Sequence, residues 1–167
     1  AGTWGLAGAN TYSGATTIGA GTLIAAANNA LGTEAAGTTV ADGATLGFSG
    51  GITYSTTEAV TLTGAGAAGR AGALDNISGD NSFAGTLTLV GGGNSTIGTT
   101  AGTFTHSGNT VGASDLTYTP ANGTTITEPG VISGAGTNVI KAGAGTLVLS
   151  GANTYDGTTT LTQGTLR

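Results

Sequence analysis

The sequence predicts an all-β protein that winds as a parallel β-helix, a β-solenoid with open ends. Three observations support this fold class over a sandwich or a barrel. The sequence repeats internally, and the same unit stands near both ends, which a closed barrel or sandwich has no reason to show. The strand candidates are also very short, rich in threonine, and separated by Gly, Asn-Gly or Asp-Gly turns.

The repeat unit is clearest when Ala1–Ile24 is laid over Ala144–Arg167. The two segments are identical at 15 of 24 positions without a gap. A weaker third copy runs over Gly79–Gly85, and it begins almost midway between the equivalent glycines Gly8 and Gly151. If one turn takes roughly 24 residues, each of the two intervals is about three turns. The shared repeat positions are Gly8, Asn10, Tyr12, Gly14, Gly79, Asn81, Phe83, Gly85, Gly151, Asn153, Tyr155 and Gly157.

We expect one solenoid module over residues 1–167, with strong repeats at 1–24 and 132–167 and a weaker one near 78–90. A corner-like loop at Ala25–Gly32 follows the opening repeat, and Gly64–Gly72 forms an excursion from the core. The strand candidates between these segments, in chain order, are Thr38–Val40, Ala44–Phe48, Ile52–Tyr54, Ala59–Thr63, Thr86–Val90, Thr96–Gly98, Gly102–Thr105, Asp115–Thr119, Gly123–Thr127, Gly130–Ser133, Asn138–Lys141, Thr146–Leu149 and Thr158–Leu161.

In a parallel β-helix, strands one turn apart lie about 4.8 Å from each other. One inward column of apolar side chains is therefore expected: Leu6, Ile18, Leu23, Leu46, Leu62, Leu89, Ile126, Leu149 and Leu161. Threonine suits the outward positions because a β-branched side chain fits the pleat. Tyr12, Phe83 and Tyr155 are expected to pack at one corner of the coil rather than to stack on sugars. Asparagine at Asn10, Asn81 and Asn153 suits turns.

Composition excludes several classes of function. The chain has 167 residues, no cysteine, and only three basic residues against eight acidic ones. A nucleic-acid partner needs clustered Lys and Arg, so we expect none, and an anionic membrane surface is disfavoured for the same reason. No apolar run is long enough to span a bilayer as a helix, so we expect no membrane insertion of this segment. Without cysteine there is no disulfide and no thiolate metal site.

Catalytic chemistry and a metal site are also not expected. His106 is the only histidine, and we interpret it as a solvent-facing turn residue because no nucleophile-elbow pattern surrounds it. The eight acids are scattered next to turn residues, whereas a glycan-cleaving β-helix would gather them in one groove: Glu34, Asp42, Glu58, Asp75, Asp80, Asp115, Glu128 and Asp156. Asp75, Asp80 and Asn81 could offer calcium ligands, but turn formation explains them better.

The residues at the two ends resemble the autotransporter-associated β-strand repeat, also called the passenger-associated transport repeat. The resemblance rests on Ile132–Gly136 and Lys141–Tyr155, and Gly2–Leu23 follows the same pattern with departures at Trp4 and Gly5. It implies a right-handed parallel β-helix within a passenger domain of a large bacterial autotransporter or adhesin-like surface protein. It further implies display at the cell surface or secretion, and it brings no catalytic residues or cofactor.

We therefore expect a structural, non-catalytic module of an extracellular stalk, adhesin or filament, joined end to end to copies of itself. Matching open repeats at both ends favour such continuation, either as a tandem array or as stacked subunits. Two alternatives stay open: a surface module that binds cell-surface carbohydrate or ice, and a polysaccharide-degrading enzyme. Ice binding would need aligned Thr-x-Thr pairs, and the spacing of Thr86–Thr88, Thr103–Thr105 and Thr125–Thr127 looks too irregular for it.

Overall fold

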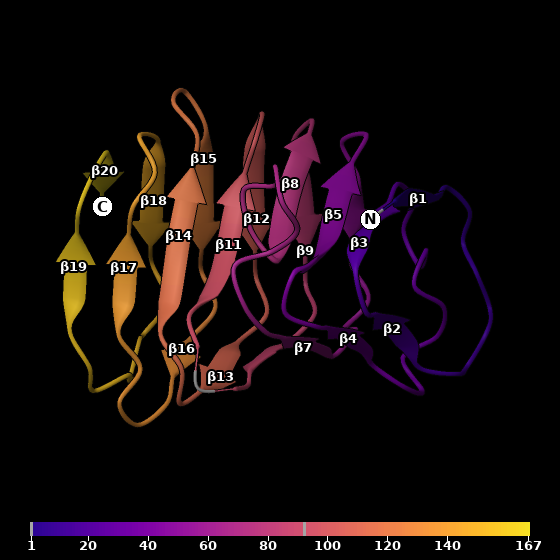
Figure 1. The fold of residues 1–167 in the computed structure, drawn as a ribbon, viewed down its shortest axis with the longest axis horizontal. Coiled ribbons are helices and arrows are strands. Elements are labelled where there is room, and N and C mark those ends of the chain that lie inside the picture. The colour runs from indigo at the N-terminus through magenta and orange to yellow at the C-terminus, as the bar shows by residue number, and fades with distance from the viewer. Residues whose placement is uncertain (1, 92) are drawn as a thin grey trace.

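The protein is a right-handed parallel β-solenoid of about seven turns, as the sequence predicted. The computed structural model describes residues 2–91 and 93–167, which form twenty strands and no helix. In Figure 1 the near strands run upward and the far strands run downward while the chain advances from right to left, which is a right-handed winding. Every strand pair is parallel, so each turn satisfies the backbone of the next.

Three sheets form the sides of the coil, and the chain visits them in the order A, C, B. Sheet A contains β1 (Thr3–Leu6), β3 (Gly21–Ala25), β5 (Ala44–Ser49), β8 (Leu74–Ser78), β11 (Ser95–Thr99), β14 (Leu116–Pro120), β17 (Val139–Lys141) and β19 (Thr159–Leu161). Sheet B contains β2 (Thr16–Ile18), β4 (Thr38–Val40), β7 (Val60–Leu62), β10 (Leu87–Leu89), β13 (Thr110–Gly112) and β16 (Ile132–Ser133). Sheet C contains β6 (Thr53–Tyr54), β9 (Asn81–Phe83), β12 (Thr103–His106), β15 (Thr125–Glu128), β18 (Thr146–Leu149) and β20 (Thr165–Leu166).

The length of a turn varies along the coil. A short turn leads from Trp4 to its register partner Leu23, whereas a much longer turn leads from Leu46 to Leu74. The longer turn contains the Gly64–Gly72 excursion, which folds back on sheet A: the Ala67 amide donates to Thr45 Oγ1 at 2.9 Å. Variable loops between constant strands explain why the repeat is hard to see in the middle of the sequence.

The core is formed by three sets of inward columns, one set per sheet, and not by the single column that we predicted. Leu23, Leu46 and Leu161 belong to sheet A, Ile18, Leu62 and Leu89 to sheet B, and Ile126 and Leu149 to sheet C. The reason is that each complete turn, such as β5–β6–β7, contributes one strand to every side of the coil. The alternation of inward and outward residues was correct, but the residues of one sequence repeat were assigned to one side.

Aromatic side chains fill the middle of the coil. Phe48 lies with its ring centroid 5.2 Å from Phe83 and 5.6 Å from Phe104, and Tyr54 completes the cluster at 6.0 Å from Phe48. All four side chains are fully buried. Such offset and edge-on pairs stabilise a core by about 1 kcal/mol each beyond the area they bury.

Glycine stacks on glycine at the corner where the chain leaves sheet C. A Cβ at Gly108 would lie 1.9 Å from the Gly85 carbonyl oxygen, one at Gly130 would lie 1.9 Å from that of Gly108, and one at Gly151 would lie 2.0 Å from that of Gly130. Neighbouring turns thus approach too closely at this corner for any other residue. The two chain ends lie at opposite ends of the coil (Figure 1). No helix of the described residues is long and apolar enough to cross a membrane.

Candidate functional site

The three sequence copies lie on two different sides of the coil. The first copy follows β1 and the middle copy follows β8, and both of these strands belong to sheet A, three strand positions apart. The last copy follows β18, which belongs to sheet C. Gly8 and Gly79 are therefore three turns apart. Gly79 and Gly151 are separated by three turns and, in addition, by the step from sheet A to sheet C. The repeat is preserved in local conformation but rotated within the coil.

The first and last copies share their local contacts. Tyr12 Oη lies 2.8 Å from Thr16 Oγ1, and the equivalent Tyr155 Oη lies 2.7 Å from Thr159 Oγ1. The middle copy differs, because Phe83 is fully buried within β9 whereas Tyr12 is exposed. Phe83 belongs to the aromatic cluster of the core, and its backbone is part of sheet C. The aromatics at this repeat position therefore occupy different environments.

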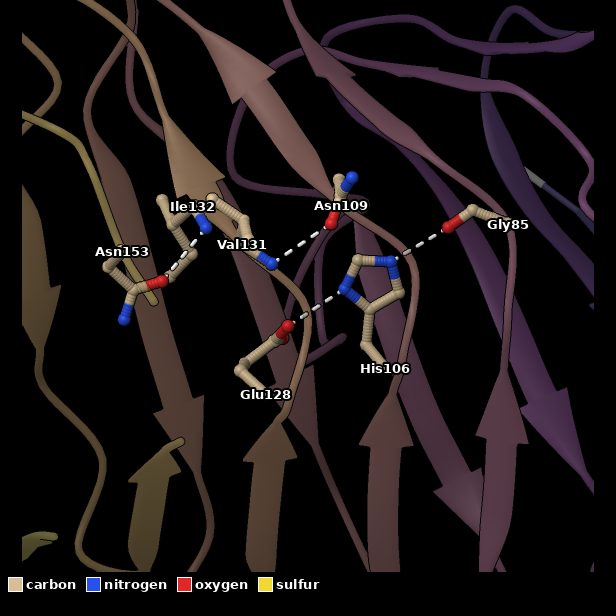
Figure 2. Close-up of polar contacts among 7 residues, drawn as sticks. All are labelled: Gly85, His106, Asn109, Glu128, Val131, Ile132 and Asn153. Atoms are coloured by element: carbon tan, nitrogen blue, oxygen red, sulfur yellow. Dashed lines mark hydrogen bonds and ion pairs between the residues drawn. The ribbon is translucent and has the colours of Figure 1, made fainter. Parts of the chain in front are cut away.

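The asparagine of the repeat connects one turn to another. Asn10 Nδ2 donates to the Ala30 carbonyl oxygen of the following turn at 2.7 Å. Asn153 Oδ1 accepts from the Ile132 amide of the preceding turn at 2.8 Å, as Figure 2 shows. Asn81 Oδ1 likewise accepts from the Ile52 amide of the preceding turn, at 2.7 Å. Asn10 and Asn153 therefore act between turns. Asn81 also bonds within its local turn, as the sequence suggested, because its Nδ2 donates to the Ser78 carbonyl oxygen at 2.8 Å.

His106 lies inside the coil, so the prediction of a solvent-facing turn residue is wrong. It is the last residue of β12 and is fully buried, with its ring stacked on Phe83 at a centroid distance of 5.7 Å. Its Nδ1 lies 2.8 Å from Glu128 Oε2, and its Nε2 donates to the Gly85 carbonyl oxygen at 2.8 Å (Figure 2). The sequence could have indicated this position, because His106 lies two residues after Phe104 and its side chain therefore points to the same face of the strand.

The His106–Glu128 pair holds a proton in the core. Because the Gly85 oxygen can only accept, Nε2 must carry a proton, and a second proton must lie between Nδ1 and the Glu128 carboxylate. Burial alone would lower the pKa of His106, but the charge of Glu128 and the two hydrogen bonds outweigh it and raise that pKa. Burial, followed by the nearby Glu128, raises the pKa of Tyr118 far above its usual range. The other oxygen of Glu128 and the Tyr118 hydroxyl have no hydrogen-bond partner within the described part of the chain.

The eight acids do not converge on a groove. Among the described residues, no group of three or more His, Cys, Asp or Glu could hold a metal ion. Three acids that we expected at turns are buried: Glu58, Asp75 and Glu128. Acids at exposed positions connect turns instead, as where Glu34 accepts from the Thr57 amide at 3.0 Å.

The three calcium candidates use their oxygen atoms within the chain. Asp75 accepts from the Thr100 hydroxyl at 3.1 Å, and Asp80 accepts from the Thr103 amide at 2.8 Å. Asn81 Oδ1 is the acceptor for Ile52 described above. These contacts support the interpretation that the three residues shape and connect turns.

Two further buried polar residues were not singled out from the sequence. Asn76 lies in the middle of β8 in sheet A, and its Nδ2 has four oxygen atoms within 3.2 Å, the nearest being the Ala101 carbonyl at 2.7 Å. Lys141 is buried at an inward position of β17 and donates to the Gln163 carbonyl at 3.0 Å. Burial lowers the pKa of Lys141. The inward parity of both residues, next to Leu74 and Val139, would have identified them.

The fold and these contacts define a structural repeat protein of the β-solenoid class. A family model described as Passenger-associated-transport-repeat matches residues 1–25 and 139–167. This match agrees with the resemblance of the two end segments to the autotransporter-associated repeat. No curated protein matches the chain, and no solved structure matches it.

Proposed function

We propose that this chain is a non-catalytic scaffold module in the passenger of a secreted or cell-surface protein, and that it extends a stalk or filament away from the cell. The observation that carries the proposal is the hydrogen-bond ladder, because three parallel sheets run along the coil in register. Such a ladder makes the coil stiff along its axis, and any module with the same cross-section can continue it. The matched transport repeats and the solenoid fold support a passenger role.

The buried polar groups also fit a mechanical role better than a catalytic one. The His106–Glu128 pair and Lys141 are enclosed in the coil, where a polymeric substrate cannot reach them. Asp80, Asp115 and Asp156 bond to residues of a neighbouring turn. Their hydrogen-bonding capacity is used to hold turns together.

A surface-display assay tests the scaffold role. The chain is placed between a reporter domain at its N-terminus and an outer-membrane anchor at its C-terminus, and the displayed reporter is counted by antibody binding. We expect Gly108→Val to abolish display, because its side chain would overlap the Gly85 carbonyl oxygen of the neighbouring turn. The outward substitutions Thr39→Lys and Thr88→Lys should leave display unchanged. Loss of display in the outward variants, with an unchanged circular dichroism spectrum, would show that a specific surface and not the coil carries the function.

A second candidate function is ice binding by the outer face of sheet C. Thr103 pairs with Thr125 and Thr105 with Thr127, so two Thr-x-Thr pairs lie side by side on successive turns, which the spacing in the sequence had concealed. Thr86–Thr88, in contrast, leads into sheet B. The hydroxyls of Thr105, Thr125 and Thr127 make no hydrogen bond within the described chain, which leaves them free for ordered water.

Thermal hysteresis decides this second candidate. If sheet C binds ice, the unmodified chain should show hysteresis, and Thr105→Lys with Thr127→Lys should abolish it. The pair Thr39→Lys with Thr61→Lys on sheet B is the matched control and should change nothing. Absence of hysteresis in the unmodified chain at high concentration would eliminate the candidate.

A further inference from the structure

The chain contains one Asn-Gly dipeptide, Asn122–Gly123, in the turn that connects β14 to β15. Figure 1 shows this turn at the upper edge of the coil. Both residues are exposed, and a Cβ at Gly123 would meet nothing within 4 Å. Gly123 has a φ of 77°, as the third position of a type II turn requires. The turn is closed by Thr124, whose amide and hydroxyl both donate to the Ala121 carbonyl oxygen, at 3.0 and 2.8 Å.

The side chain of Asn122 differs from most other asparagine side chains of the coil. It makes no hydrogen bond within the described part of the chain. The asparagines whose side chains bond to a neighbouring turn are Asn10, Asn28, Asn76, Asn81, Asn94, Asn109, Asn138 and Asn153. Asn29 precedes an alanine, and its side-chain oxygen is buried. Asn122 is therefore the exposed asparagine whose amide is free to react.

From these observations we propose that Asn122–Gly123 is a site of spontaneous succinimide formation, at which the coil modifies its own turn. Glycine has no side chain to shield its amide nitrogen. When the turn opens, the Gly123 nitrogen attacks Asn122 Cγ. The N–Cγ bond forms, the Cγ–Nδ2 bond breaks, and ammonia leaves with the proton of the Gly123 amide. Water then opens the ring at Cγ, which gives aspartate, or at the backbone carbonyl carbon of Asn122, which gives isoaspartate.

The two products differ in their effect on the coil. Isoaspartate lengthens the backbone of the turn by one carbon atom, whereas aspartate adds only a charge. The turn is held on both sides, because the Ala121 amide donates to the Thr99 carbonyl oxygen at 2.9 Å and the Thr124 carbonyl oxygen accepts from the Thr146 amide at 2.9 Å. A Cβ at Gly145 would lie 2.3 Å from the Ala121 carbonyl oxygen, so the next turn is already in close contact. We therefore expect isoaspartate, and not aspartate, to weaken the pairing around this turn.

Mass spectrometry of the aged chain tests the site. The folded chain is incubated in mildly alkaline buffer and cut with trypsin, which releases residues 71–141 by cleavage after Arg70 and Lys141. We expect the mass increase of deamidation at Asn122, with fragment ions of both aspartate and isoaspartate. The hydrogen-bonded asparagines of the same peptide should stay unmodified and serve as internal controls: Asn76, Asn81, Asn94, Asn109 and Asn138. An unmodified Asn122 in the folded chain, at a time when the chain unfolded in urea has reacted there, would overturn the proposal.

A second Asn-Gly dipeptide in the same chain provides the matched control. Asp156→Asn creates it next to Gly157, where a Cβ would lie 2.2 Å from the Thr137 carbonyl oxygen of the preceding turn and where the side chain at position 156 accepts from the Gly136 amide. These contacts must open before the reaction, so we expect it to be about ten-fold slower there than at Asn122. Equal rates at the two positions would show that the dipeptide alone sets the reactivity, and would contradict the role of the exposed turn.

Thermal unfolding distinguishes the effects of the two products. Asn122→Asp carries the charge of the product without the added backbone atom, so it should unfold at the same temperature as the fresh chain. The aged chain should unfold at a lower temperature, whereas ageing should leave Asn122→Gln unchanged, because its longer side chain does not form the five-membered ring. If the aged chain and Asn122→Asp unfold at the same temperature, the expected weakening by isoaspartate is wrong. No readout here depends on secretion or display, so the inference is tested separately from the scaffold role.

Discussion

At the scale of single residues, the His106–Glu128 pair is the most demanding contact in the coil. Its two charged groups are fully enclosed, and each loses its hydration on folding. Removing one partner of such a pair leaves the other buried and uncompensated, which costs about 3–5 kcal/mol. Replacing both partners by apolar residues avoids that cost.

We predict that Glu128→Leu lowers the free energy of unfolding by about 3–5 kcal/mol. The double variant His106→Phe with Glu128→Leu should recover most of this loss, because Phe83 and Leu149 already form the adjoining parts of the same inward column. Urea denaturation followed by circular dichroism measures both. Equal stability of the single and the double variant would contradict the buried-pair account.

Stability should also depend on pH through three buried groups. The pKa of Glu58 and that of Asp75 are raised chiefly by burial, from 4.5 and 3.8, and that of His106 is raised from 6.5. A raised pKa means that the folded state binds the proton more tightly than the unfolded state does. The contribution of each group to the free energy of unfolding is therefore fully present below its unfolded pKa, and it is lost as pH rises through its folded pKa.

We therefore predict a larger free energy of unfolding at pH 5 than at pH 8. Urea denaturation at both values checks this. The variant His106→Phe with Glu128→Leu should show a smaller difference, because one of the three groups is removed. A stability that rises steadily from pH 5 to pH 8 would contradict the assignment.

At the scale of residues, the sequence predicts which side chains point inward from their alternation along each strand. Alternation correctly placed apolar residues such as Ile126 toward the core. It equally placed His106, Glu128 and Lys141 there, but we interpreted His106 and Glu128 as turn residues and did not single out Lys141. A polar residue is tolerated at an inward position when a residue of the next turn forms a hydrogen bond with it, as Glu128 does with His106. Local sequence does not show that partner.

At the scale of elements, the corner glycines set the distance between turns. We predict that Gly108→Ala lowers the free energy of unfolding by about 3 kcal/mol, because the added methyl overlaps a backbone oxygen that cannot move aside. Gly93→Ala is the matched control, since nothing lies within 4 Å of its Cβ, and should change stability by less than about 0.5 kcal/mol. Thermal denaturation measures both, and equal effects would contradict close approach at the corner.

The positions of the strands were predicted correctly, but the sheet to which each strand belongs was not. Candidates such as Thr38–Val40 and Thr146–Leu149 match β4 and β18. The spacing between Gly79–Gly85 and Gly151–Tyr155 suggested a whole number of turns. Because the turns differ in length, the spacing does not show the additional step from sheet A to sheet C. Only the register of paired strands reveals it.

At the scale of the whole molecule, the turns of the coil stack around one continuous apolar core, and the chain has no cysteine that could form a disulfide. Backbone pairing joins each turn to its immediate neighbours, so stability accumulates along the axis. Trp4 and Leu161 are exposed because each has a register partner on one side only. Leu161 is 52% exposed although its first-repeat equivalent, Ile18, is 6% exposed beneath the following turn.

Distances along the outside of sheet B test the winding itself most directly. Thr17, Thr39, Thr61, Thr88, Val111 and Ser133 are successive register partners. Because the chain has no cysteine, spin labels can be placed in pairs from Thr17 to Thr88, to Val111 and to Ser133. Pulsed electron paramagnetic resonance should give backbone separations of about 14, 19 and 24 Å, one step of about 4.8 Å per turn. A separation from Thr17 to Ser133 no larger than that to Thr88 would contradict the solenoid.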